Sequence, residues 1–185
     1  MKNKERFTGI FCLPVTPFTK GDIDEEVLRS IIDIIIEDGA DGLVPTGATG
    51  EFPYLLHEER KKVQEIVLDQ ANGRVPVIAG TGATNTKEAL ILTKYAKDIG
   101  CDGVMLSHPI LLRATDDQTY SYYEKIATSV DIPIVMYNNP NLGQSMRARW
   151  FVPKMVKNGF KSVFTFLGSI RTYLMSRIKD AHEHT

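Results

Sequence analysis

Short apolar runs alternate with amphipathic helical patterns along most of the chain. The predicted strands begin 33, 33, 28, 29 and 30 residues apart, at Gly9–Pro14, Gly42–Pro45, Val75–Ala79, Gly103–Ser107, Ile132–Tyr137 and Ser162–Phe166. Each run is apolar almost throughout, which is typical of parallel strands that helices cover on both faces. The pattern therefore predicts repeated βα units around a parallel sheet.

Helix start and stop signals lie in the segments between these strands. Asp24 is placed to cap the first helix, and Gly39 is placed to end it. Thr86 begins a later helix, and Asp116 or Asp117 begins the fourth. Strand and helix thus follow each other in a regular order, with no linker that would separate two domains.

Composition and charge exclude several classes of protein. The 185 residues are 43% hydrophobic, which suits one globular domain, and 22 basic residues balance 23 acidic ones. Such a balance predicts no nucleic-acid partner and no anionic membrane partner. No apolar run reaches the ~18 residues of a membrane helix, and the first residues lack a signal-peptide core. Cys12 and Cys101 lie far apart, so we expect reduced, buried thiols in a cytoplasmic protein.

Length alone does not decide between two α/β architectures. An open, doubly wound sheet of five or six strands fits 185 residues. A (β/α)8 barrel needs eight units and about 250 residues. Counting residues favours the open sheet, whereas the motifs favour the barrel.

Several motifs occur in a recognisable order. They are Gly9-Ile-Phe-Cys-Leu-Pro-Val-Thr-Pro-Phe, Gly47-Ala-Thr-Gly-Glu, Val77-Ile-Ala-Gly-Thr-Gly and Pro133-Ile-Val-Met-Tyr-Asn-Asn-Pro. Over residues 7 to 166 the chain resembles the dihydrodipicolinate synthase / N-acetylneuraminate lyase family. The resemblance implies a (β/α)8 TIM barrel, assembled in the family as a homotetramer, of which this chain carries about six units. We expect a partial barrel over residues 1–166 and a non-matching tail over residues 167–185.

The resemblance also implies a chemistry and the residues that carry it. Family members are pyruvate-dependent aldolases and lyases, in which a lysine at the end of the sixth strand forms an imine with a 2-oxo acid. Tyr137 matches the tyrosine that transfers protons at the end of the fifth strand. Ala48 and Thr49 match the turn that binds the substrate carboxylate. The expected partners are pyruvate and an aldehyde, and no cofactor or metal is implied.

Three positions depart from the family pattern near the substrate. Ile110 and Leu111 stand where many members carry two tyrosines, so a phenol of the proton relay is missing. Leu142 stands where dihydrodipicolinate synthases place an arginine for the carboxylate of the aldehyde. This substitution favours a sugar-acid or another neutral aldehyde as the second substrate.

The largest departure is at the imine-forming position. Leu167 aligns with the family lysine, and leucine has no nitrogen to form an imine. Lys161 lies at the opposite end of the same predicted strand, and Lys179 lies in the tail without a family match. Two hypotheses remain: the chain represents a Schiff-base aldolase or lyase, or it is a catalytically inactive, truncated or frame-shifted relative that binds a 2-oxo acid. Six strands of eight would also leave the first and sixth strands with unpaired edges.

Overall fold

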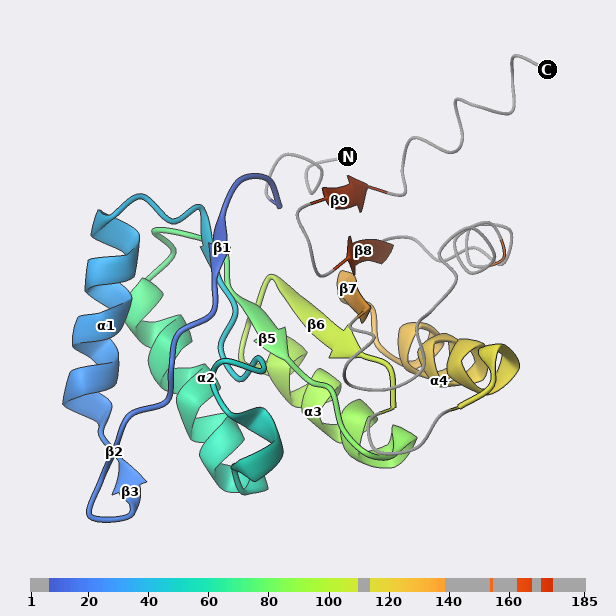
Figure 1. The fold of residues 1–185 in the computed structure, drawn as a ribbon, viewed down its shortest axis with the longest axis horizontal. Helices are drawn as coiled ribbons and strands as arrows, with labels where there is room; N and C mark the ends of the chain where they lie inside the picture. The colour runs from blue at the N-terminus through green and yellow to red at the C-terminus, as the bar shows by residue number, and fades with distance from the viewer. Residues whose placement is uncertain (1–6, 110–113, 139–153, 155–162, 168–170, 175–185) are drawn as a thin grey trace. The chain divides into compact units, whose positions relative to one another are not determined.

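Strands and helices alternate along the chain, as the thirty-residue period predicts (Figure 1). The structure is a computed structural model that describes residues 7–109, 114–138, 154, 163–167 and 171–174. The elements are β1 (Phe11–Cys12), β2 (Phe18–Thr19), β3 (Asp22–Ile23), α1 (Glu25–Glu37), β4 (Gly42–Leu43), the 3-10 helix η1 (Phe52–Tyr54), α2 (His57–Ala71), β5 (Ile78–Gly80), α3 (Thr86–Asp98), β6 (Gly103–Ser107), α4 (Asp116–Ser129), β7 (Ile134–Asn138), β8 (Val163–Leu167) and β9 (Arg171–Leu174).

The chain divides into two compact units. The first comprises Met1–Thr81 and Lys94–Val104, and the second comprises Gly82–Thr93 and Met105–Thr185. Helix α3 and strand β6 therefore contribute residues to both units. The turn with Ala48 and Thr49 belongs to the first unit, and Tyr137 belongs to the second.

The βα strands of the first unit, β1, β4 and the segment that leads into β5, run parallel. β1 pairs with β4 through Phe11 and Gly42 and through Cys12 and Leu43. Leu43 also forms a parallel bridge with Val77, just before β5. These pairings confirm the parallel arrangement that the continuous apolar runs predict.

Parallel pairing continues in the second unit and then stops. β7 pairs in parallel with β8, but β8 pairs antiparallel with β9. The expectation that the sixth strand has an unpaired edge was wrong, because β9 pairs with that edge. Among the described residues β1 pairs with β4 alone.

A short hairpin precedes α1 and was not expected from the apolar pattern. β2 and β3 pair antiparallel across a loop formed by Lys20 and Gly21. Both loop residues have positive φ, 51° and 94°. Two such residues suit the tight turns that connect twisted antiparallel strands.

Helix α1 begins and ends where the sequence predicts. The side chain of Asp24 accepts a 3.1 Å hydrogen bond from the backbone N–H of Val27. Gly39 follows the helix with a φ of 91°, a conformation that glycine adopts without steric cost. Leu28 and Ile32 are fully buried and form the inner face of α1.

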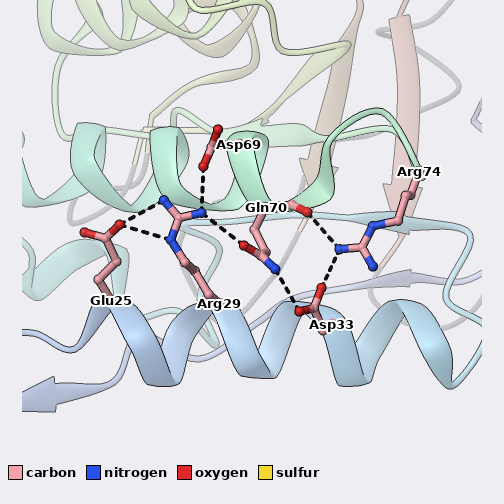
Figure 2. A network of polar contacts seen from close by, with 6 residues as sticks. All are labelled: Glu25, Arg29, Asp33, Asp69, Gln70 and Arg74. Atoms are coloured by element: carbon pink, nitrogen blue, oxygen red, sulfur yellow. Dashed lines mark hydrogen bonds and ion pairs between the residues drawn. The ribbon is translucent and has the colours of Figure 1, made fainter.

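Polar side chains join the flank of α1 to α2, as Figure 2 shows. The Arg29 guanidinium donates to Asp69 at 2.6 Å and to Gln70 at 3.0 Å. Asp33 accepts from Gln70 at 2.7 Å and also pairs with Arg74. The hydrogen bond from Arg74 lowers the pKa of the Asp33 carboxyl in the folded chain. The Asp33–Arg74 pair therefore stabilises the fold at pH values above the pKa that Asp33 has in the unfolded chain. This stabilisation is lost as the pH falls through the lower, folded-state pKa.

Replacing Arg29 tests the contribution of these ion pairs. We expect Arg29→Met to destabilise the chain by about 1 kcal/mol or less at low salt, because the pairs are largely exposed. The loss should shrink in 1 M salt, which screens exposed charges. Urea unfolding at two salt concentrations measures it. Lys62→Met is the control, since Lys62 is an exposed cation of α2 outside this network; an equal loss in both variants would contradict the interpretation.

The two cysteines differ in exposure. Cys101 is buried, and burial raises the pKa of its thiol to about 12, whereas Cys12 is only half-buried. The expectation of two buried thiols was thus correct for Cys101 only. Thiolate is the reactive form, so Cys12 should be alkylated by iodoacetamide at pH 8 well before Cys101. Peptide mass mapping over time measures the order, and faster labelling of Cys101 would contradict it.

Candidate functional site

The turn between β4 and η1 carries the two residues predicted to bind a carboxylate. Its flanks are buried, whereas Ala48 and Thr49 are exposed at its tip. The backbone N–H groups of Ala48 and Thr49 donate to no acceptor among the described residues. Adjacent open N–H groups in a turn are a setting that attracts anions. The exposed tip of the turn thus carries two backbone donors without an acceptor in the described ranges, together with the Thr49 side chain.

Two hydrogen bonds hold the backbone of this turn, one at its tip and one at its far end. The N–H of Glu51 donates to the carbonyl of Ala48 at 3.1 Å. The buried Thr16 hydroxyl, from the segment after β1, donates to the carbonyl of Gly50 at 2.9 Å. Because these bonds already order the turn, a ligand that binds there causes little further loss of conformational entropy.

Two residues of the turn that are not glycine adopt the left-handed conformation. Thr46 has a φ of 53° and Glu51 a φ of 59°. A β-branched residue such as threonine rarely adopts positive φ. Residues in such regions cost about 1–3 kcal/mol each, and they persist only where the surroundings fix them.

A buried polar cluster fixes the Thr46 end of the turn. The Gly80 carbonyl, at the end of β5, accepts from the Thr46 hydroxyl at 2.9 Å, from Arg60 Nη2 at 3.0 Å and from Gln64 Nε2 at 3.2 Å. Gln64 Nε2 also lies 3.0 Å from Thr46 Oγ1. The three side chains are at most 3% exposed. The turn is therefore tied to both β5 and α2.

Arg60 connects the same cluster to the other end of the turn. Its guanidinium carbon lies 5.2 Å from the ring centroid of Phe52, which follows Glu51. The sequence interpretation missed Arg60 and Gln64, although a signal existed. Arg60 and Gln64 follow the helical period of the buried Val67 and so fall on the inner face of α2.

Gly80 is a glycine because the turn approaches it closely. A Cβ there would lie 2.1 Å from the Thr46 carbonyl oxygen and 3.0 Å from that of Pro45. The Gly80 N–H donates to the Pro45 carbonyl at 2.9 Å. At these distances between backbone atoms there is no room for a side chain at position 80.

Tyr137, the predicted proton-transfer residue, lies in the second unit. It is half-buried near the end of β7, where buried and half-buried positions alternate. The parallel register pairs Tyr137 with Phe166 and Asn138 with Leu167. Neither Phe166 nor Leu167 carries an amine, so neither position supplies the nitrogen of an imine.

Other predicted positions lie outside the described residues. These are Ile110, Leu111, Leu142, Lys161 and Lys179. Within the described ranges no group of three or more His, Cys, Asp or Glu residues could hold a metal ion. In the same ranges no helix is long and apolar enough to cross a membrane.

Parallel strands joined by helices, with a turn and a tyrosine at the carboxyl ends of strands, place the chain among α/β proteins, which include the (β/α) barrels. The sequence matches the Dihydrodipicolinate synthetase family over residues 6–159, and the chain belongs to that family. Its fold is therefore that of the (β/α)8 TIM barrels, with about six of the eight βα units. The motifs, and not the length, indicated the right architecture.

Relatives of known name support this assignment. The 4-hydroxy-tetrahydrodipicolinate synthase of Syntrophus aciditrophicus is 49% identical over 135 residues, or 73% of this chain and 46% of that protein. The structure of YagE, a prophage protein of E. coli K12 solved in complex with pyruvate, gives a TM-score of 0.82 at 32% identity, covering 96% of this chain and 61% of that one. The 2-keto 3-deoxygluconate aldolase of Picrophilus torridus gives 0.80 at 28% identity, covering 89% and 60%. The chain thus spans about half the length of the curated relatives it matches.

Proposed function

We propose that the chain carries the 2-oxo-acid-binding part of a pyruvate-dependent aldolase or lyase. The turn of Ala48 and Thr49 receives the carboxylate, and the proton-transfer role that the family resemblance implies for Tyr137 stays a prediction. The observation that carries this proposal is a pair of exposed residues, Ala48 and Thr49, whose N–H groups donate to no acceptor in the described ranges, on a turn that buried contacts hold in a strained conformation. The choice of ligand is supported by YagE, whose structure was solved in complex with pyruvate.

The chain, as it stands, binds the 2-oxo acid without forming an imine. In the complete reaction a lysine amine attacks the keto carbon, water leaves, and the protonated imine accepts the electrons of the broken carbon–carbon bond. Leu167 offers no amine for this attack. The second hypothesis from the sequence, a catalytically inactive relative that binds a 2-oxo acid, therefore describes the chemistry at this position, whereas the aldolase describes the complete family barrel.

The second substrate of the complete barrel is a neutral aldehyde. Leu142 cannot pair with a carboxylate as an arginine does. The likeness to an enzyme named 2-keto 3-deoxygluconate aldolase supports a sugar-derived aldehyde. The name shared by the curated relatives supports the competing choice, the substrate of 4-hydroxy-tetrahydrodipicolinate synthase.

Pyruvate binding to the purified chain tests the role of the turn. We expect saturation-transfer NMR to detect binding of pyruvate and not of pyruvamide, which lacks the carboxylate. Thr49→Val removes the hydroxyl and should weaken binding at least tenfold, because a hydrogen bond to a charged group contributes about 1.5–3 kcal/mol. Thr19→Val, the same change at an exposed threonine of β2, is the control. Equal affinity of Thr49→Val and the native chain would contradict the proposal.

Borohydride reduction in the presence of pyruvate tests the absence of the imine. We expect the intact mass of the native chain to stay unchanged, because reduction traps only a covalent imine. A mass gain of one reduced pyruvate would overturn this part of the proposal. Peptide mapping would then identify the reactive amine, with Lys161 and Lys179 as the first positions to examine.

A further inference from the structure

Gln64 is a polar residue at a position of α2 where an apolar residue would suit the surroundings. It is fully buried, as are Val63 and Val67 on the inner face of the same helix. Its side-chain nitrogen donates to the Thr46 hydroxyl at 3.0 Å and to the Gly80 carbonyl at 3.2 Å. Its oxygen, Oε1, is buried and accepts no hydrogen bond from the part of the chain that the structure describes. A buried acceptor without a donor lowers stability.

The carbonyl that the Gln64 amide faces fixes the orientation of that amide. The Gly80 oxygen can only accept, so the amide atom 3.2 Å away from it is the nitrogen. Turning the amide over would bring two acceptor oxygens together. The unsatisfied oxygen therefore belongs to the environment of Gln64 and does not depend on how the two amide atoms are assigned.

The neighbours of Gln64 keep other partners when its amide is removed. The Gly80 carbonyl also accepts from the Thr46 hydroxyl at 2.9 Å and from Arg60 Nη2 at 3.0 Å. The Thr46 hydroxyl likewise keeps Gly80 as its acceptor. Removing the amide would thus leave both groups bonded, and it would remove a buried oxygen that has no donor. What the amide adds is a second hydrogen bond to the Thr46 side chain.

This second bond acts on the residue that shapes the backbone of the turn. Thr46 has a φ of 53°, which a β-branched residue rarely adopts. A Cβ at Gly50 would lie 3.4 Å from the Thr46 nitrogen, so the two ends of the turn are in close contact. Only residues 47–49 lie between these ends. The direction of the Ala48 and Thr49 N–H groups therefore depends on the conformation of Thr46.

We propose that Gln64 is a positioning residue, which raises the affinity of the turn for a carboxylate and lowers the stability of the fold. The inference rests on the proposed function, in which Ala48 and Thr49 receive the carboxylate of a 2-oxo acid. The amide holds the Thr46 hydroxyl from a second side and so increases the fraction of chains with a preformed turn. The apparent affinity of a site falls in proportion to that fraction. Loss of stability in favour of a binding site is a common trade-off in proteins.

Gln64→Met tests the proposal, because methionine has a similar length and no amide. We expect pyruvate to bind about three- to tenfold more weakly in a saturation-transfer NMR titration, the range that one hydrogen bond supplies. The urea midpoint of unfolding should stay the same or rise, because the unsatisfied oxygen is gone. A residue that only stabilises the fold would give the opposite result, a lower midpoint at unchanged affinity.

Two further variants separate action through Thr46 from general damage to α2. Thr46→Val should weaken pyruvate binding, and adding Gln64→Met to it should change the affinity by less than about twofold more, because the hydroxyl that the amide holds is already absent. Val67→Ala is the matched control, since it removes buried volume from the same helix face without removing a polar group. It should lower the urea midpoint and leave the pyruvate affinity unchanged.

Amide hydrogen exchange reports on the turn without a ligand. The N–H groups of Glu51 and Gly80 donate to the carbonyls of Ala48 and Pro45, so their exchange measures opening of the turn. We expect faster exchange at both amides in Gln64→Met without a loss of global stability. Equal pyruvate affinity in Gln64→Met and the native chain, or a lower urea midpoint, would overturn the positioning role. A native chain that fails to bind pyruvate would instead overturn the proposed function, and the exchange rates would still show whether Gln64 holds the turn.

Discussion

Gly80→Ala is expected to remove at least about 3 kcal/mol of stability, a large part of the 5–15 kcal/mol typical of a folded domain. The added methyl would lie 2.1 Å from the Thr46 carbonyl oxygen and 2.6 Å from its carbonyl carbon. Neither atom can move away, because the Thr46 hydroxyl and the Pro45 carbonyl are both bonded to Gly80 itself. Overpacking that side chains relieve costs about 1–3 kcal/mol, and a clash with fixed backbone exceeds that range.

The measurement is urea unfolding followed by circular dichroism, with Gly82→Ala as the matched control. A Cβ at Gly82 would meet the Ser107 hydroxyl oxygen at 2.2 Å, which is the end of a side chain that rotates. We expect a loss of about 1–2 kcal/mol there and less in the double variant with Ser107→Ala. If Gly80→Ala proved as mild as Gly82→Ala, the turn would be free to move, and its proposed role as a preformed anion site would fail with it.

The apolar runs predict the positions of the strands better than their lengths. Residues 103–107 were predicted as a strand and form β6 with the same bounds. Six residues were predicted around β1, but only Phe11 and Cys12 pair. A run of apolar residues shows that a segment is buried, whereas strand length depends on a partner for the backbone. Among the described residues, β1 lacks such a partner on one edge.

β9 could not be predicted from the period that revealed the other strands. Arg171–Leu174 begins four residues after the end of β8 and pairs antiparallel with it. The thirty-residue period describes βα units, so it carries no information on a segment that leaves that pattern. The β2–β3 hairpin was missed for a similar reason, because its signal is the Lys20–Gly21 turn and not an apolar run.

The exposed part of the candidate site was predictable, whereas the contacts that support it were predictable only in part: the helical period places Arg60 and Gln64 on the inner face of α2. Glycines on both sides of Ala48 and Thr49 mark a turn where a backbone can approach a ligand. The left-handed conformation of Thr46 is invisible in the sequence, because threonine normally avoids it. The sequence shows Gln64 only as a polar residue on that face of α2. That its side chain donates a hydrogen bond to the Gly80 carbonyl is known from the structure. The strain and its compensation are properties of contacts between three separate elements.

A lysine at position 167 is expected to convert the chain from one that binds pyruvate to one that reacts with it. The last residue of β8 pairs in register with Asn138, beside Tyr137 at the end of β7. The neutral amine of a lysine is the nucleophile that attacks the keto carbon. With Leu167→Lys, borohydride and pyruvate should therefore add one reduced pyruvate per chain, where the native chain adds none.

Two further variants decide whether the new amine acts through the proposed site. Thr19→Lys places the same side chain at an exposed position of β2 and should give no adduct. Adding Tyr137→Phe to Leu167→Lys should slow adduct formation about 100-fold, as expected on removing a positioned general acid or base. An adduct of equal yield in Thr19→Lys would show unspecific trapping by any lysine. An unchanged rate without the Tyr137 hydroxyl would place the chemistry elsewhere, because imine formation at the end of β8 requires a proton donor for the departing water.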